Sequence, residues 1–242
     1  MKKGIFITGT DTGVGKTVVA AALASYLKSN GLDVGVMKPI HTGCRLIKSK
    51  PMGEDTQLLM HAARVQAAAE LVTPYCLKYP LSPWMASQLE GINLKLSVLL
   101  KAYHQLRQRY TFLVVEGIGG LAVPITARLT VMDLALRFGL PLLVVARPGL
   151  GTLNHTKLTL AYAKAKKIPV IGVILNQTQN HKTGLAEKNN PAALTAFCKV
   201  PILGNIPFIK GLELHGSGLN RAVMRVGRHI RMEALMDRMG LK

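Results

Sequence analysis

A glycine-rich loop between a strand-like run and a helical segment constrains the fold more than any other feature. The loop is Gly9-Thr-Asp-Thr-Gly-Val-Gly-Lys-Thr17. Lys3 to Thr8, before it, is short, apolar and rich in β-branched residues, and Thr17 to Lys28, after it, has Ala and Leu at helical spacing. In a strand–loop–helix unit, backbone N–H groups converge on phosphate groups and the helix N-terminus adds its dipole. The sequence therefore predicts a phosphate cradle.

The loop assigns roles to single residues. We expect Lys16 to reach the outer phosphates of a nucleotide and the Thr17 hydroxyl to bind Mg²⁺. The nucleotide contacts predicted for the whole loop are Gly13, Val14, Gly15, Lys16, Thr17 and Val18. The strict P-loop pattern has Gly where this chain has Thr10, which indicates the branch with altered loops. Many members of that branch carry a second Lys where this chain has Asp11, which argues against a partition-type ATPase and for a small-molecule enzyme.

Strands alternate with helices along the rest of the chain. The strands are predicted at Val34–Pro39, Phe112–Glu116, Pro141–Ala146, Val170–Asn176 and Ile202–Ile206, and the helices at Glu54–Ala69, Leu94–Arg109, Thr152–Lys167, Ala192–Lys199 and Asn220–Lys242. This alternation predicts an α/β fold, a mostly parallel sheet flanked by helices on both faces, of the P-loop NTPase type. We expect a single domain over residues 1–242, and a loop from His41 to Gly53. The last helix reads as basic and amphipathic, with Val226 and Ile230 among its apolar positions.

The composition indicates where the protein is located and whether its cysteines are paired. No apolar run approaches the roughly 20 residues that span a bilayer, and the N-terminal residues lack a signal-peptide pattern, so we expect a cytoplasmic protein that is not in a membrane. Cys44, Cys76 and Cys198 are odd in number and far apart, and we expect them to be reduced.

The chain is strongly basic. It has 31 Lys and Arg against 12 Asp and Glu, a net charge of +19 that attracts ATP but also nucleic acid or anionic lipid. Only 5% of the residues are aromatic, which leaves few platforms for stacking on single strands. We favour a solvated basic surface and expect no nucleic-acid partner. A P-loop partition-type ATPase that binds nucleic acid is the alternative.

Ligands gather at the carboxyl ends of parallel strands. The residues at those ends are Thr8-Gly9, Lys38-Pro39, Glu116-Gly117, Arg147-Pro148 and Asn176. Glu116 has few structural explanations, because it ends an apolar run and precedes Gly117-Ile-Gly-Gly120. Asn176 can present both a donor and an acceptor to a base. We assign no role to His41, His155 or Cys44.

Several separated motifs together resemble the dethiobiotin synthetase family. They are Gly9-Thr-Asp-Thr-Gly-Val-Gly-Lys-Thr17, Lys38-Pro-Ile-His-Thr-Gly43, Asp55, Ser82-Pro83, Val115-Glu-Gly-Ile-Gly-Gly120, Gly149-Leu-Gly-Thr-Leu-Asn-His155 and Asn176, and the resemblance runs from Lys3 to about Phe208. It implies an ATP- and Mg²⁺-dependent enzyme of biotin synthesis. Such an enzyme carboxylates 7,8-diaminopelargonic acid with CO₂, phosphorylates the carbamate and closes the ureido ring.

The resemblance also implies roles for individual positions. Lys38 and Lys16 would be catalytic, and Thr17, Asp55 and Glu116 would bind Mg²⁺. Further nucleotide contacts would come from Gly117, Ile118, Gly119, Asn176, Gln177, Ile206 and Pro207, and substrate contacts from Thr12, Thr42, Gly149, Leu150 and Asn154. In the family, the segment around Gly149 holds the substrate's carboxylate tail for the neighbouring subunit, which implies a homodimer.

Overall fold

Six parallel strands form the central sheet of the computed structural model, which describes residues 4–47, 50–180, 182–214 and 216–241. Their order across the sheet is β10-β9-β8-β1-β7-β2. The bounds are β1 Gly4–Gly9, β2 Val34–Met37, β7 Phe112–Gly120, β8 Leu142–Ala146, β9 Val170–Asn176 and β10 Ile202–Ile206. Every residue of β1 and β8 is buried, as expected for parallel strands covered on both faces. The predicted strands are confirmed, although β7 continues to Gly120.

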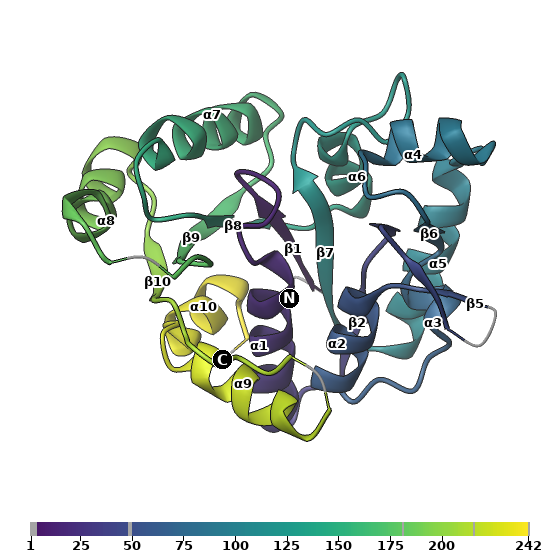
Figure 1. Cartoon of the computed structure of the whole chain (residues 1–242), viewed down its shortest axis with the longest axis horizontal. Helices are drawn as coiled ribbons and strands as arrows, with labels where there is room; N and C mark the ends of the chain where they lie inside the picture. Colours follow the sequence, from purple (N-terminus) through teal and green to yellow (C-terminus); the bar gives the residue numbers. More distant parts are fainter. Residues whose placement is uncertain (1–3, 48–49, 181, 215, 242) are drawn as a thin grey trace.

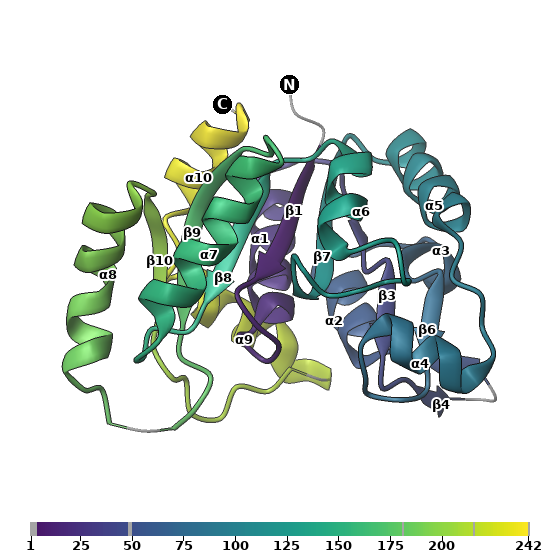
Figure 2. The same ribbon diagram turned by 90° about the horizontal axis from the view of Figure 1, so that it is seen from above.

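Helices cover both faces of this sheet (Figures 1 and 2). α1 (Lys16–Ser29), α9 (Leu219–Gly227) and α10 (Met232–Met239) lie on one side, and α6 (Val131–Phe138) and α7 (Thr152–Ala165) lie on the other. α5 (Leu96–Arg109) packs against β2, β7 and α6, and α8 (Leu185–Cys198) packs against α7 and β10. The predicted α/β class, with a parallel sheet between two layers of helices, is confirmed.

The prediction of a loop from His41 to Gly53 was wrong. β3 (Ile40–Thr42) pairs in parallel with β6 (Tyr75–Leu77), and β4 (Arg45–Ile47) pairs with β5 (Lys50–Met52) in antiparallel fashion. Lys48 and Ser49 lie outside the described residues. These strands are only three residues long and give little periodic signal on their own, and the sequence does not show which segments pair with them.

The helix predicted from Glu54 to Ala69 ends early. α2 spans Glu54–Ala62, and the chain leaves the helix at Arg64, whose φ of 52° is left-handed. The short α3 (Ala69–Val72) follows, and α4 (Pro83–Glu90) and α6 complete the helices that the sequence pattern did not predict. α4 begins with Ser82 at its N-cap and Pro83 in its first turn, a start signal that could have been recognised.

The C-terminal segment is two helices rather than the single helix predicted. α9 and α10 are separated near Ile230, which bridges to Gly204 on β10. The Asn205 N–H donates to the His229 carbonyl at 3.2 Å, and the Arg231 N–H donates to the Leu203 carbonyl at 2.7 Å. These bonds to the edge strand interrupt the helix. Val226 and Ile230, two of the predicted apolar positions, are buried. Lys3 and Lys242, at the ends of two predicted elements, lie outside the described residues.

α8 also differs from its prediction, since it begins at Leu185 and not near Ala192. The sequence prediction started the helix after Pro191, but Pro191 lies inside α8.

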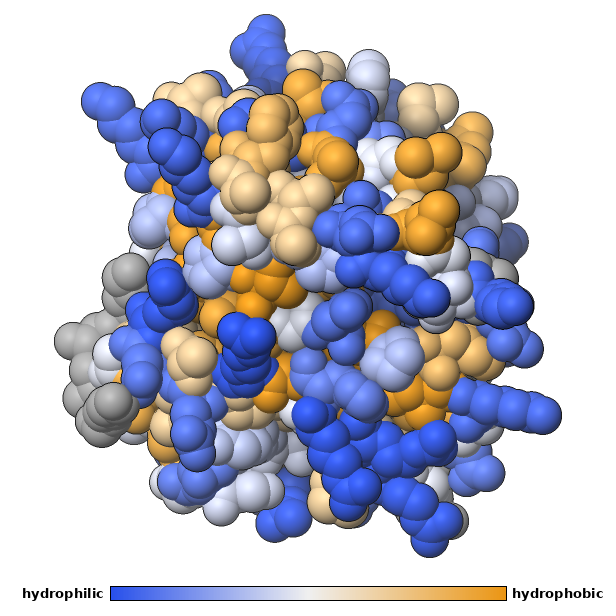
Figure 3. Space-filling model, turned by 90° about the vertical axis from the view of Figure 1, so that its left-hand side faces the viewer, coloured by the Kyte–Doolittle hydropathy of each residue, from blue (hydrophilic) through white to orange (hydrophobic). Residues whose placement is uncertain are grey.

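Within the described ranges no helix is long and apolar enough to cross a membrane. Figure 3 shows the face at the left of Figure 1, where hydrophilic side chains are scattered with apolar ones between them.

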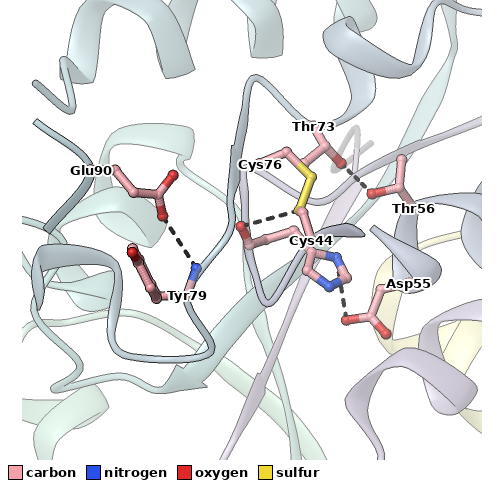
Figure 4. Close-up of a disulfide and its surroundings, with 8 residues drawn as sticks. Cys44, Asp55, Thr56, Thr73, Cys76, Tyr79 and Glu90 are labelled. Atoms are coloured by element: carbon pink, nitrogen blue, oxygen red, sulfur yellow. Dashed lines mark hydrogen bonds and ion pairs between the residues drawn. A yellow bond between two sulfur atoms is a disulfide. The ribbon is translucent and has the colours of Figure 1, made fainter. Parts of the chain in front are cut away.

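Cys44 and Cys76 form a disulfide, so the prediction that they are reduced was wrong (Figure 4). Their Cα atoms are 5.8 Å apart although the residues are 32 positions apart in sequence. The β3–β6 ladder brings them together, because it continues into a hydrogen bond of 2.9 Å from the Cys44 N–H to the Leu77 carbonyl. Sequence spacing alone does not reveal this pairing. Cys198 is free.

Removing this disulfide is expected to lower the free energy of unfolding. A closed loop of this length restricts the unfolded chain, so the variant Cys44→Ser/Cys76→Ser should lose about 2–4 kcal/mol. Urea denaturation with and without dithiothreitol measures the loss. Cys198→Ser is the control and should change little. Equal stability of the parent protein in oxidising and reducing buffer would contradict the expectation.

Candidate active site

The phosphate loop follows β1 and is shaped by two left-handed glycines. Gly13 has a φ of 72° and Gly15 a φ of 86°, and Gly15 is the N-cap of α1. Asn176, at the end of β9, donates from Nδ2 to the Val14 carbonyl at 2.9 Å. A Cβ atom added at Gly15 would collide with that same amide nitrogen. Asn176 therefore holds the phosphate loop in place, although the sequence analysis assigned this residue to the nucleotide base.

Lys16 is held inside the loop. Its ammonium donates to the Asp11 carbonyl at 3.1 Å, and the residue is only 6% exposed. Burial lowers the pKa of Lys16 from 10.5 to about 8, with Lys38 lowering it further and Glu116 opposing the shift. A poorly solvated cation at the start of a helix is suited to receive phosphate oxygens.

ATP affinity is expected to fall as pH rises above about 8. The pKa of Lys16 in the folded protein, about 8, lies below its ordinary value of 10.5, so the folded state releases this proton first. Between these values the unfolded state binds more protons, so this group makes the fold more stable as pH rises while the charge that binds phosphate is lost. Calorimetric titration with ATP from pH 7 to 9.5 should show a dissociation constant rising by up to about tenfold per pH unit.

Lys16→Arg is the matched control for this titration, because a guanidinium stays charged throughout the range. Its ATP affinity should not depend on pH between 7 and 9.5. A parent protein whose affinity is equally flat would contradict the assignment of the titrating group to Lys16.

Lys38, Asp55, Glu116 and Thr17 form a cluster beside the loop, in which Lys38 and Glu116 are buried and Asp55 and Thr17 are partly exposed. The Lys38 ammonium lies 2.5 Å from Glu116 Oε1 and 2.8 Å from Asp55 Oδ2. The Thr17 hydroxyl donates to Glu116 Oε1 at 2.9 Å. Burial acts to lower the pKa of Lys38, but the two carboxylates raise it above its ordinary value, so the ammonium stays protonated. Burial acts to raise the pKa of Asp55, and Lys38 overcomes this and holds it low.

The cluster fits a magnesium ion. Glu116 is 1% exposed, and its Oε2 atom has no hydrogen-bond partner among the residues that the structure describes. Mg²⁺ takes oxygen ligands and needs one or two carboxylates, because phosphates and water complete its shell. No group of three or more His, Cys, Asp or Glu side chains that could hold a metal occurs in the described ranges. The arrangement therefore fits an ion that arrives with phosphates rather than a closed protein cage.

The glycine run after Glu116 lies against the phosphate loop. β7 pairs with β1 as far as Gly120, which is opposite Gly9. Gly119 has a φ of 58°, and a Cβ atom there would lie 3.5 Å from the Thr12 hydroxyl. Gly119 therefore lies beside Thr12, and the nucleotide and substrate contacts predicted for Gly117, Ile118, Gly119 and Thr12 stay predictions.

The predicted base-binding residues also meet. Gln177 follows Asn176 at the end of β9, and its N–H donates to the Ile206 carbonyl at 2.9 Å. Pro207 follows directly after β10. Asn176 is buried, and its Nδ2 atom donates a hydrogen bond to the Val14 carbonyl in the phosphate loop. Contacts of these four residues with adenine remain a prediction.

Two residues near the site were not assigned a role from sequence. His41 precedes Thr42 on β3, and its Nδ1 lies 3.8 Å from Asp55 Oδ2. Burial lowers the pKa of His41, which packs against Gly53 at the start of α2. Arg147 donates from Nη2 to Asp11 Oδ2 at 2.7 Å. The sequence signal that could have pointed to Arg147 is its position directly after a predicted strand.

The predicted binding segment for the carboxylate tail is largely exposed. Gly149, Leu150 and Asn154 belong to the turn before α7 and to its first residues. Leu150 is 92% exposed, and Asn154 is exposed as well. The side chains of Leu150 and Asn154 face solvent, and the role predicted for this segment in the site of a second subunit stays a prediction.

A left-handed glycine loop after β1, with Lys16 and Thr17 at its end and a buried Glu116 on the neighbouring strand, defines a P-loop nucleotide-binding protein. A family model described as an AAA domain matches residues 3–215. The ATP-dependent dethiobiotin synthetase BioD of Thermodesulfovibrio yellowstonii is 43% identical over 88% of this chain and 92% of its own length. That of Bacillus licheniformis is 40% identical over 98% and 97%. The chain belongs to the ATP-dependent dethiobiotin synthetase family.

Solved structures with the same fold are more distant. A ParA family ATPase from Chlorobium tepidum has a TM-score of 0.58 at 16% identity, covering 97% of this chain and 99% of that one. The septum site-determining protein MinD from Pyrococcus horikoshii, complexed with Mg-ADP, has a TM-score of 0.57 at 18% identity, covering 99% and 95%. These likenesses show the P-loop fold alone. The family membership does not favour the alternative of a partition-type ATPase.

Proposed function

We propose that this protein is a dethiobiotin synthetase that converts 7,8-diaminopelargonic acid, CO₂ and ATP into dethiobiotin, ADP and phosphate. The observation that carries the proposal is the pair of buried lysines, Lys16 and Lys38, beside Glu116 and Asp55 at the end of the phosphate loop. Both steps of the reaction build negative charge on oxygen atoms. Cations held in a buried site stabilise such charge more strongly than they would in water.

The reaction would proceed in three steps. One amine of the substrate attacks CO₂ and loses a proton, which gives a carbamate. A carbamate oxygen then takes the γ-phosphoryl group of ATP, and ADP leaves. The second amine attacks the carbamate carbon and loses a proton, and phosphate leaves as the ring closes.

The chain's own residues supply charge and position. Glu116 and Asp55 keep the Lys38 ammonium protonated, so that it can bind carbamate oxygens when the site is loaded. Lys16 and the N–H groups of the loop would bind the phosphates. Mg²⁺ bound by Thr17, Asp55 and Glu116 would neutralise charge on the transferred phosphoryl group. Thr12 and Thr42 would bind the diamine.

The active form would be a homodimer. The exposed segment with Gly149, Leu150 and Asn154 supports this, since a glycine turn before a helix is suited to bind a carboxylate. Leu158, on the next turns of α7, is 62% exposed and would be covered by the partner. We also propose a cytoplasmic location, where ATP is available.

The test is phosphate release by the purified protein with Mg²⁺, ATP and bicarbonate, with and without the diamine, while mass spectrometry follows the product. We expect phosphate release that depends on the diamine and a cyclic urea product. Hydrolysis that is indifferent to the diamine but raised by DNA would overturn the proposal and favour the partition-type ATPase.

A further inference from the structure

Asp11 is the one acidic side chain in the phosphate loop from Gly9 to Thr17, and all three of its acceptor groups are used. Its Oδ1 accepts the Thr12 N–H at 2.7 Å, and its Oδ2 accepts from Arg147 at 2.7 Å. Its backbone carbonyl accepts from Lys16 at 3.1 Å. Asp11 thus connects the predicted substrate contact Thr12, the phosphate-binding Lys16 and Arg147.

The sheet aligns Arg147 with Asp11. Gly9 on β1 lies opposite Val145 on β8, and the Thr10 N–H donates to the Val145 carbonyl at 2.9 Å. Asp11 and Arg147 each lie two residues after this pair, in the loops that follow the two strands. Asp11 and Arg147 therefore meet because of strand register rather than a chance surface approach.

The turn that carries Arg147 is itself anchored. Asn190 on α8 is buried and donates from Nδ2 to the Pro148 carbonyl at 2.7 Å and to the Gly149 carbonyl at 3.1 Å. Holding the backbone on the C-terminal side of Arg147 lowers the entropic cost of placing its guanidinium. The same turn leads into the segment proposed to bind the substrate's carboxylate.

A carboxylate in this loop works against nucleotide binding. ATP brings several negative charges to a loop in which Asp11 already carries one, and like charges at short range repel. Arg147 supplies the opposite charge at hydrogen-bonding distance. Both side chains are about half exposed, 46% for Arg147 and 49% for Asp11, so the pair itself contributes little to folding stability.

We propose that Arg147 is a positioning residue for ATP binding, which neutralises Asp11 and orients it so that the loop holds Lys16 and Thr12 for the nucleotide. The inference rests on the proposed function only in taking ATP as the ligand of this loop. It assigns the effect of Arg147 to nucleotide affinity and not to the fold or to the chemical step.

The test is the dissociation constant of Mg-ATP, measured by calorimetry without the diamine, for Arg147→Met, Arg147→Lys and Asp11→Asn/Arg147→Met. We expect Arg147→Met to bind ATP about tenfold more weakly with an unchanged urea midpoint. Arg147→Lys should recover part of the loss. The double variant should bind ATP more tightly than Arg147→Met, because it leaves no unpaired carboxylate beside the phosphates.

Lys28→Met is the matched control, because it removes one positive charge, in the last turn of α1, and one ion pair, with Asp33. It should change ATP affinity less than threefold. An Arg147→Met variant within threefold of the parent would overturn the inference, as would a double variant that binds no better than the single one. If diamine-dependent turnover fails in the parent while these affinity differences hold, the proposed reaction is wrong and the role of Arg147 stands.

Discussion

Lys38→Met is expected to reduce diamine-dependent turnover on the order of 10³-fold, because the variant removes a buried cation from the position where carbamate charge develops. It should also lower the free energy of unfolding by about 3–5 kcal/mol, since it leaves the buried Glu116 without its opposite charge. Steady-state phosphate release and urea denaturation measure the two effects.

A double variant tests whether the loss of stability comes from the unpaired Glu116 charge. Lys38→Met/Glu116→Gln removes both charges of the Lys38–Glu116 pair and should regain most of the lost stability. It should not regain turnover, because it also lacks the Glu116 carboxylate that is proposed to bind Mg²⁺. A Lys38→Met protein that keeps turnover within tenfold of the parent would show that Lys38 does not act on the reacting atoms.

Gly15→Ala is expected to weaken ATP binding on the order of 10²-fold. Its Cβ atom would collide with the Asn176 amide, and the φ of 86° is unfavourable for alanine by roughly 1–2 kcal/mol. Overpacking adds about 1–3 kcal/mol, and the loop relieves both by moving away from its phosphate-binding shape. Calorimetric titration with Mg-ATP measures the loss.

Gly31→Ala provides the control for backbone strain alone. Gly31 has a nearly equal φ of 82°, but a Cβ atom there meets nothing within 4 Å. This variant should lose about 1 kcal/mol of stability and bind ATP like the parent. If Gly15→Ala binds ATP as well as Gly31→Ala does, the packing of Asn176 against the loop does not set its shape.

The sequence was sufficient to predict the sheet and most of the cluster beside it. The strands of the main sheet are largely apolar runs, and Glu116 stands out because its charge follows such a run. Parallel strands bring their carboxyl ends to one edge, so Thr17, Lys38 and Glu116 could be placed together without coordinates. The structure shows that they contact one another, and the roles that the resemblance implies for them stay predictions.

Features that depend on pairing between distant segments were not predictable. The β3–β6 ladder and the Cys44–Cys76 disulfide need two segments about 30 residues apart to find one register. Ile230 looked like one more apolar position of a helix, and only its bridge to Gly204 shows why the helix stops there. Asp11 and Arg147 were both noticed in the sequence, but their contact follows from the register of β1 and β8.

The packing of α9 on α1 has a consequence for the order in which the protein matures. β1, the phosphate loop and α1 are synthesised before α9, which covers α1 and lies beyond the residues that the family model matches. One side of α1 therefore stays uncovered in a nascent chain until α9 has emerged. We expect the helix that follows the phosphate loop to reach its final packing only after that step.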